Sequence, residues 1–322
     1  MGPISAPENQ WTWVPFPETR CGNGTPAGIG LNPAPGGSRR VFVYMAGGGA
    51  CWDFITCYQL RTSAHVEDTY TQALLDSEVA GLSAAKVTER QDAANPFRDA
   101  HFVYIPYCTG DLHGGDAIRG YDSTRPDRKM HHVGASNVAA FLEHLKATFP
   151  DTEQIWLTGT SAGGYGAQLN FDQFSLAFPN ARVDLLADSA QVVMPSAERW
   201  QAMFTAWKPR FPEGCTDCAQ RLPALIDTLA TRWPDRRLGL LAYDNDGVLS
   251  SYFNYSAGQM VSATNALLAN QYSRPNTRSF VVTGNSHGML DDYKTLMGPG
   301  GVSLESWIRQ WAVGDPGWSN VR

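Results

Sequence analysis

The sequence predicts an α/β fold in which helices cover both faces of a mostly parallel central sheet. Short runs of β-branched and aromatic residues recur along the chain, stretches with helical spacing of apolar residues lie between them, and glycines follow several of the runs. Strands that alternate with helices pair in parallel, because each helix carries the chain back across the sheet. We expect one domain over residues 1–322, which is long enough to bury a large core.

The first strand is expected at residues 41–45 (VFVYM), directly before the three glycines Gly47 to Gly49. The 40 residues that precede it are rich in Pro, Gly and Trp, so we interpret them as a segment that wraps the domain. Later runs of the same kind predict strands at residues 101–106, 155–157, 183–187, 238–243 and 279–283.

Helices are expected between these strands. Val138, Phe141, Leu142 and Leu145 are spaced by three or four residues, which predicts a helix over residues 137–149. Further helices are expected at residues 162–177, 258–270 and 303–313. The stretch from about 190 to 236 contains several Pro and Trp residues and a Cys-Thr-Asp-Cys turn, and we interpret it as an inserted lid or cap rather than a separate domain.

Composition and charge exclude several classes of protein. The chain has 25 Lys and Arg against 31 Asp and Glu, a net charge of −6, so we expect no nucleic-acid partner and no attraction to anionic membranes. No apolar run approaches the roughly 18 residues of a membrane-spanning helix. Hydrophobic residues make up 43% of the chain and charged residues 17%, which is typical of globular proteins.

Six cysteines favour an oxidising compartment. Their even number suits three disulfides, although spacing alone leaves the connectivity open. Two pairs are close enough to join locally and two cysteines remain, so the expected disulfides are Cys51–Cys57, Cys215–Cys218 and Cys21–Cys108. For the Cys-Thr-Asp-Cys turn, a redox or zinc site is the alternative, but no second such motif and no nearby pair of histidines accompanies it.

The N-terminus, MGPISAPENQ, lacks the basic and apolar regions of a signal peptide. The protein is therefore either cytosolic or a mature form from which an exporting segment is absent. Because the cysteines favour the second interpretation, we expect a secreted or periplasmic protein.

The strongest chemical signal is a serine between glycines. Residues 159–163 read Gly-Thr-Ser-Ala-Gly, a G-x-S-x-G pattern, after a predicted strand and before a predicted helix. The glycines permit a sharp turn, and the helix N-terminus directs N–H groups at a developing anion. Ser161 is the predicted nucleophile, and a structural serine in a glycine-rich turn is the alternative.

A nucleophilic serine needs a base, and in this pattern the acid and then the histidine follow it along the chain. Of the seven histidines only His287 follows Ser161, so His287 is the predicted base, with a solvated loop histidine as the alternative. Asp244 and Asp246 both follow the predicted strand at residues 238–243. We prefer Asp246, because a position one step beyond the strand end has better reach to the imidazole, but Asp244 stays open.

An oxyanion hole needs N–H donors from a second loop. The glycines after the first predicted strand stand where such enzymes carry this loop. We expect the donors to be Gly49 or Ala50, together with the N–H of Ala162, and the alternative is a plain turn. This chemistry requires no metal and no organic cofactor.

These residues resemble the family of pectin acetylesterases and Notum-like carboxylesterases. Residues 41–57 (VFVYMAGGGACWDFITC) are similar to the glycine-rich segment and cysteine pair of the family. The similarity extends from about Trp11 to the final predicted helix, and further matching segments are residues 106–111 (PYCTGD), 132–137 (HVGASN), 158–167 (TGTSAGGYGA) and 188–189 (DS).

The resemblance implies an α/β-hydrolase-like fold and an extracellular serine esterase. By the same resemblance Ser161 is the nucleophile, Asp246 or Asp244 the acid and His287 the base, and the pairing of Cys51 with Cys57 is supported. The chain departs from the family at Ala50, where a Trp is typical, and in its Asp-Gly-Val acid loop, which lacks a following Gln. Both departures affect the pocket wall, so the substrate does not transfer with the resemblance.

The function predicted from the sequence is that of a secreted serine carboxylesterase that deacetylates a carbohydrate such as pectin. A lipid deacylase or a polyester hydrolase is the alternative. An amidase or peptidase with the same triad, and a non-catalytic binding protein, are the competing classes. The expected partner is an ester substrate, an acetylated polysaccharide or another extracellular ester.

Overall fold

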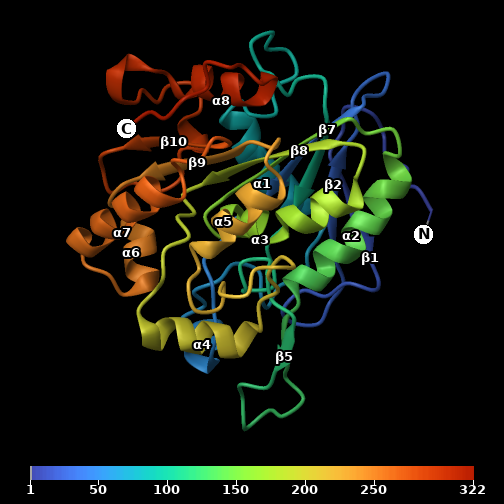
Figure 1. The fold of residues 1–322 in the computed structure, drawn as a ribbon. Coiled ribbons are helices and arrows are strands. Elements are labelled where there is room, and N and C mark those ends of the chain that lie inside the picture. The colour runs from blue at the N-terminus through green and yellow to red at the C-terminus, as the bar shows by residue number, and fades with distance from the viewer. Residues whose placement is uncertain (1) are drawn as a thin grey trace.

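An eight-stranded sheet runs through the protein, here a computed structural model that describes residues 2–322 (Figure 1). The strand order is β1-β2-β4-β3-β7-β8-β9-β10. The strands of this sheet are β1 (Thr12–Phe16), β2 (Ala27–Asn32), β3 (Arg40–Met45), β4 (His101–Ile105), β7 (Gln154–Thr160), β8 (Arg182–Asp188), β9 (Leu238–Tyr243) and β10 (Thr277–Val282). A separate hairpin consists of β5 (Ala117–Arg119) and β6 (Met130–His132).

The pairing confirms a mostly parallel sheet. All neighbours from β4 to β10 pair in parallel, whereas β2 is antiparallel to both β1 and β4. In an open parallel sheet, the loops at the carboxyl ends of the strands form the usual place for a ligand site. The predicted nucleophile, acid and base all lie just beyond strands of this parallel part.

The first 40 residues do more than wrap the domain, which corrects the sequence-based expectation. They contain β1 and β2, and these strands extend one edge of the sheet. The sequence of β2, AGIGLN, reads as a loop because glycines are rare in strands. Here the glycines serve close packing, since a Cβ on Gly30 would collide with the side chain of Leu75.

Eight α-helices surround the sheet in the described part of the chain (Figure 1). They are α1 (Gln72–Ala84), α2 (Gly134–Thr148), α3 (Ala162–Ala177), α4 (Ala197–Trp207), α5 (Ala224–Arg232), α6 (Gly247–Phe253), α7 (Ala257–Asn270) and α8 (Leu304–Val313). The four predicted helices correspond to α2, α3, α7 and α8. None of the helices within residues 2–322 has the length and apolar character needed to cross a membrane.

Successive residues of β3 enter two different hydrophobic cores. Val41 and Val43 belong to the core that contains Phe171 of α3, whereas Phe42 belongs to the core that contains Trp311 of α8. This alternation follows from the two-residue repeat of a strand, and burial on both faces is typical of parallel sheets. Strand β3, which pairs with the strand β7 that leads to Ser161, is thus held between two packed layers.

Residues 190–236 divide into two parts with different surroundings. Helix α5 packs against α3, and its Leu225 and Leu229 lie in the main core. It is the helix that carries the chain from β8 to the parallel neighbour β9, as such a connection requires. Helix α4 instead buries Met203 and Trp207 against Ala50, at the glycine loop. Of the predicted lid, only α4 lies against the glycine loop, whereas α5 belongs to the core of the fold.

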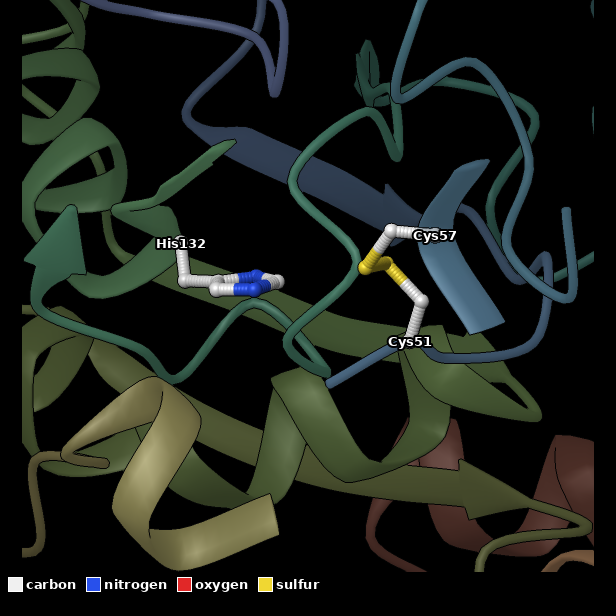
Figure 2. Close-up of side chains that lie close together, drawn as sticks. All are labelled: Cys51, Cys57 and His132. Carbon is white, nitrogen blue, oxygen red and sulfur yellow. A yellow bond between two sulfur atoms is a disulfide. The ribbon is translucent and has the colours of Figure 1, made fainter. Parts of the chain in front are cut away.

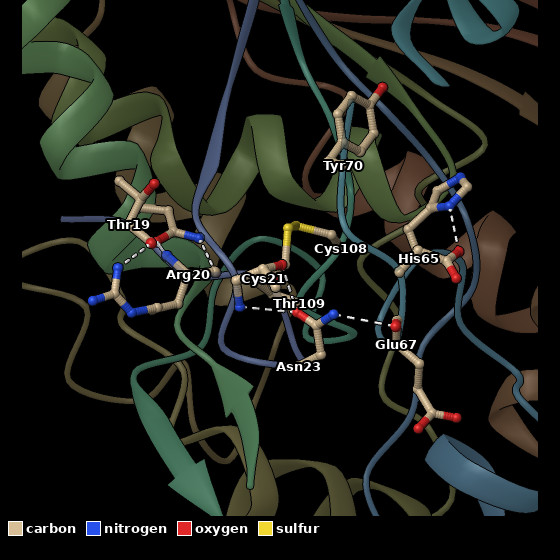
Figure 3. The surroundings of a disulfide bond; sticks show 12 residues. Thr19, Arg20, Cys21, Asn23, His65, Glu67, Tyr70, Cys108 and Thr109 are labelled. Atoms are coloured by element: carbon tan, nitrogen blue, oxygen red, sulfur yellow. Dashed lines mark hydrogen bonds and ion pairs between the residues drawn. A yellow bond between two sulfur atoms is a disulfide. The ribbon is translucent and has the colours of Figure 1, made fainter. Parts of the chain in front are cut away.

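The structure contains the three expected disulfides. Figure 3 shows Cys21–Cys108, which joins the connection between β1 and β2 to the segment after β4. Both cysteines are buried, and Gly22 N donates to Cys108 O at 2.6 Å beside the bond. This disulfide fastens the N-terminal strands to the parallel part of the sheet.

Replacing Cys21 and Cys108 together by alanine should lower the free energy of unfolding by about 4 to 5 kcal/mol, because the bond closes the longest of the three loops, with a sequence separation of 87. Replacing Cys215 and Cys218, which are separated by 3 positions, should cost about 2 kcal/mol and is the matched control. Urea unfolding without reductant measures both losses. Equal losses would contradict the assigned role of the long loop.

Candidate active site

Ser161 occupies a sharp turn between β7 and α3. Its backbone has φ 59° and ψ −124°, a left-handed conformation that is strained for a residue with a side chain. A Cβ on Gly159 would lie 2.5 Å from the Gly163 carbonyl carbon, and one on Gly163 would collide with the carbonyl oxygen of Met45. The glycines of the G-x-S-x-G pattern are needed because the turn presses against the end of β3.

Asp246 and His287 are joined directly. His287 Nδ1 lies 2.7 Å from Asp246 Oδ2, and the Asp246 side chain is fully buried. The other carboxylate oxygen, Oδ1, accepts from Val248 N at 3.0 Å and Leu249 N at 2.9 Å, which caps the start of α6. A carboxylate accepts hydrogen bonds, so Nδ1 carries the proton and Nε2 offers its lone pair.

Asp244 has a different partner. Its Oδ1 accepts from Gly284 N at 3.0 Å, in the loop that follows β10. Of the two carboxylates left open by the sequence, the structure therefore brings Asp246 and not Asp244 to the imidazole. Asp246, two residues after Asp244, lies on the turn that caps α6, and this turn faces His287.

Ser161 and His287 are brought to the same edge of the sheet by a shared neighbour. Ser161 N donates to Asp188 O at 2.9 Å, and Met289 N donates to Asp188 Oδ1 at 2.9 Å. Within residues 2–322 no hydrogen bond joins Ser161 Oγ to His287 Nε2. Bonds between a nucleophile and its base are often long without substrate and tighten in the complex.

The glycine loop offers one of its two predicted donors. Ala50 N donates to Thr62 O at 3.1 Å, so this amide is engaged and does not serve an oxyanion in this structure. Within residues 2–322, the N–H groups of Gly49 and Ala162 have no acceptor. Ala162 is the first residue of α3, where N–H groups lack helical partners. Of the two predicted donors in the glycine loop, the structure thus leaves the Gly49 N–H free among the described residues and engages the Ala50 N–H.

Thr62 and Tyr252 brace this loop, and the sequence did not mark either residue. Tyr252 Oη donates to Thr62 O at 2.5 Å, and Ala64 N donates to Gly48 O at 2.8 Å. A Cβ on Gly49, whose φ is 76°, would collide with Thr62 O. The loop over residues 62–64 fixes the glycines from one side, through backbone contacts that leave no motif in the sequence.

An apolar cavity opens beside Ser161. It is narrow, with a volume of about 30 Å³, and Ser161 and Ala162 form one side of it. The remaining lining residues are Gly49, Ala50, Leu112, Tyr165, Met203, Leu249, Tyr252 and Phe253. Tyr165 Oη donates to Gln191 O at 2.6 Å, so the two tyrosines turn their hydroxyls to backbone carbonyls and their rings to the cavity. The cavity therefore suits an apolar group.

A second narrow cavity, of about 20 Å³, lies on the other side of Leu112 and Tyr165. Both residues line both cavities, so they form the wall between them. The second cavity is also lined by Trp200 and Trp207 of α4 and by Leu225 of α5. Movement of the two wall residues would join the cavities into one apolar space.

Cys51, Cys57 and His132 form a compact buried cluster (Figure 2). Their ligand atoms lie within 4.8 Å of one another, but the two sulfurs share a disulfide. His132 Nδ1 lies 2.8 Å from Thr109 O, and its Nε2 lies 2.9 Å from Tyr121 Oη. Burial lowers the pKa of His132 to about 4. A neutral imidazole with both nitrogens engaged, next to a disulfide, has a structural role.

Asp111 is a fully buried carboxylate at the second cavity. It accepts from Thr109 Oγ1 at 2.6 Å, Gly134 N at 2.8 Å and Gly115 N at 3.2 Å, and so holds the start of α2. Burial raises the pKa of Asp111 to about 6, although these hydrogen bonds oppose the shift.

The protein should lose stability as the pH rises from about 4 to about 6, by an amount on the order of 3 kcal/mol from Asp111 alone. A carboxyl whose pKa is raised in the native state takes up a proton on folding, so its contribution is fully present below the unfolded pKa and is lost through the native one. Asp111→Asn fits the same partners and should remove this difference.

Urea unfolding of both proteins at several pH values between 4 and 7 measures the effect. The difference in free energy of unfolding between wild type and Asp111→Asn isolates Asp111 from other titrating groups. A difference that does not vary with pH would contradict the assignment.

The fold and this edge of the sheet define the class of protein. The structure matches that of the Wnt deacylase Notum from Drosophila with a TM-score of 0.70 and 20% identity, over 98% of this chain and 96% of the other. Together with the strand order and the turn at Ser161, this likeness shows the predicted α/β-hydrolase fold.

The chain belongs to the pectinacetylesterase family, whose model matches residues 13–202. It is 28% identical to the human palmitoleoyl-protein carboxylesterase NOTUM over 177 residues, which are 52% of this chain and 33% of that protein. It is 27% identical to pectin acetylesterase 11 of Arabidopsis thaliana over 159 residues, 49% of this chain and 38% of the relative. The matched part spans about a third of the length of these curated relatives.

Proposed function

We propose that the protein is a serine carboxylesterase with Ser161 as nucleophile, His287 as base and Asp246 as acid. The observation that carries this proposal is the 2.7 Å hydrogen bond between His287 and the buried Asp246, at the same sheet edge as the strained Ser161 turn. The proposal is further supported by the names of the relatives, which are carboxylesterases and an acetylesterase.

The chemistry is acyl transfer to Ser161. His287 Nε2 takes the proton from Ser161 Oγ as the oxygen attacks the ester carbonyl, and Asp246 stabilises the imidazolium that forms. The N–H groups of Gly49 and Ala162 hold the oxyanion, and each such donor typically lowers the barrier by about 3 kcal/mol. The protonated imidazole then supplies the proton to the leaving alcohol, and water attacks the acyl-enzyme by the reverse path.

We propose that the acyl group is apolar and larger than acetyl. The cavity next to Ser161 has apolar walls, and only the side chains of Leu112 and Tyr165 separate it from a second apolar cavity, so a chain longer than acetyl fits once these two side chains move. Leaving such a cavity empty forfeits the burial of apolar surface, about 0.8 kcal/mol for each methylene. The second cavity, behind Leu112 and Tyr165, offers further room of the same kind.

Deacetylation of a carbohydrate, which the sequence favoured, is the second candidate. It is supported by an open groove on the other side of α4, with a volume of about 460 Å³. The groove combines the aromatic rings of Trp52 and Tyr121 with the charged Arg119 and Glu198. Rings and charged groups together suit a polar alcohol part of the substrate, such as a sugar chain.

We also propose that the protein works in an oxidising compartment, secreted or periplasmic. Three disulfides within residues 2–322 support this location, because such bonds persist outside the reducing cytosol.

Replacing Ser161 by alanine should abolish hydrolysis of p-nitrophenyl esters while near-UV circular dichroism stays unchanged. Asp246→Asn should lower kcat by about 10⁴-fold, because the amide favours the wrong imidazole tautomer. Asp244→Asn, whose carboxylate holds Gly284 instead, is the matched control and should keep kcat within about threefold of the wild-type value. Equal losses in the two Asp variants, or turnover by Ser161→Ala, would refute the assignment.

A bulkier side chain in the cavity should shorten the preferred acyl chain. Met203→Trp is expected to lower kcat/KM for p-nitrophenyl octanoate by about 10- to 100-fold and to spare the acetate ester. Ala197→Trp, at an exposed position of the same helix that lines neither the cavities nor the groove, controls for disturbance of α4. Wild-type preference for acetate over octanoate would transfer the proposal to the carbohydrate deacetylase.

A further inference from the structure

We infer that Asp188 is a positioning residue, which holds the loop of His287 in register with Ser161. The inference rests on the proposed function. Asp188 is the last residue of β8 and is fully buried. Since β8 lies between β7 and β9 in the sheet, Asp188 stands beside the end of the strand that leads to Ser161.

The Asp188 carboxylate gathers donors from two segments of the active site. Its Oδ2 accepts from Met289 N and Leu290 N, each at 3.0 Å, and its Oδ1 accepts from Met289 N at 2.9 Å. Its Oδ2 also accepts from Thr160 Oγ1 at 2.9 Å, directly before the nucleophile. One side chain therefore links the residue before Ser161 to the two residues that follow Gly288.

The neighbouring Ser189 binds the same loop after His287. Its Oγ accepts from Gly288 N at 2.8 Å, and its backbone φ is 47°. Three successive amides after His287 are thus bound by two successive side chains of the β8 end. Meanwhile the main-chain oxygen of Asp188 accepts from Ser161 N. The turn of Ser161 and the loop of His287 are therefore both hydrogen-bonded to the same short segment, Asp188 and Ser189, at the end of β8.

The buried charge of Asp188 indicates that this residue serves the active site as well as the stability of the fold. No Lys or Arg forms an ion pair with this carboxylate among the described residues, and burial raises its pKa. A buried charge without a cation lowers stability unless hydrogen bonds satisfy it, and here backbone amides do so. The attraction between Asp188 and a protonated His287 is favourable as well.

Two carboxylates therefore position one histidine in different ways. Asp246 sets the rotation and tautomer of the imidazole through Nδ1, whereas Asp188 sets the position of the backbone that carries it. Both are needed because a displacement of about 1 Å between reacting groups costs on the order of 100-fold in rate. Asp188 touches neither the substrate nor the transferred proton.

The test compares Asp188→Asn with Asp184→Asn. Asp184 is equally buried on the same strand, but at the opposite end, where it accepts from Arg237 N at 2.7 Å and pairs with Arg182 at 2.8 Å. Asp188→Asn removes the charge. Its side-chain NH₂ group then faces a backbone N–H that donates to the carboxylate in the wild type. Each variant is assayed for kcat and KM with p-nitrophenyl octanoate and for the low-field proton resonance of the Asp246–His287 hydrogen bond.

Asp188→Asn should lower kcat by about 10- to 100-fold with KM within about twofold, and should shift or broaden the low-field resonance. Asp184→Asn should lose stability and keep both readouts. A folded Asp188→Asn with wild-type kcat and an unchanged resonance would overturn the inference.

If Asp188→Asn fails to fold, Ser189→Ala decides, because it removes only the bond to Gly288 N. A folded Ser189→Ala should lower kcat about three- to tenfold and shift the same resonance, and unchanged values for both would overturn the inference. The esterase proposal and the inference about Asp188 are contradicted by different results. Turnover by Ser161→Ala refutes the esterase triad, whereas the proton resonance reports on the His287 loop whether or not esters are hydrolysed.

Discussion

Parallel pairing of four adjacent strands is the constraint on which the rest of this structure depends. Since β7, β8, β9 and β10 run in the same direction, their carboxyl ends meet at one edge of the sheet. Ser161, Asp188, Asp246 and His287 follow or end these strands in the same order. Residues far apart in the chain thereby become neighbours, and each side chain needs only a short loop to reach the next.

Close backbone approach is the second constraint, and it explains the glycines. At Gly163 the turn of the nucleophile presses against the end of β3, and at Gly49 the neighbouring loop presses against Thr62. A side chain at Gly163 would push the turn of Ser161 away from the end of β3, and one at Gly49 would push the glycine loop away from Thr62. The same packing leaves the Gly49 and Ala162 amides without protein acceptors, and an amide without an acceptor is what an oxyanion hole requires.

The substrate side of the site depends on α4. This helix presents Met203 to the apolar cavity at Ser161 and Glu198 to the open groove, so one helix separates an apolar space from a polar one. An ester has the same division, with an acyl chain on one side of the carbonyl and an alcohol on the other. Ala50, which stands where the family typically has a tryptophan, leaves room in the cavity wall.

The sequence by itself determined the fold class and singled out Ser161 and His287 as the proposed nucleophile and base. Strand runs, helical spacing and the G-x-S-x-G turn are local patterns, and only one histidine follows Ser161. β2 was missed because its glycines hide a strand whose packing is decided by distant residues, and β1 was missed because Pro15 is unusual within a strand. Tertiary structure alone brought Asp246 and not Asp244 to the imidazole, left the Gly49 amide and not the Ala50 amide without an acceptor among the described residues, and brought Asp188 to the His287 loop. The physical reason is that each of these choices depends on where a carboxylate or an amide points across a loop, and such directions are set by contacts between segments that are far apart in the chain.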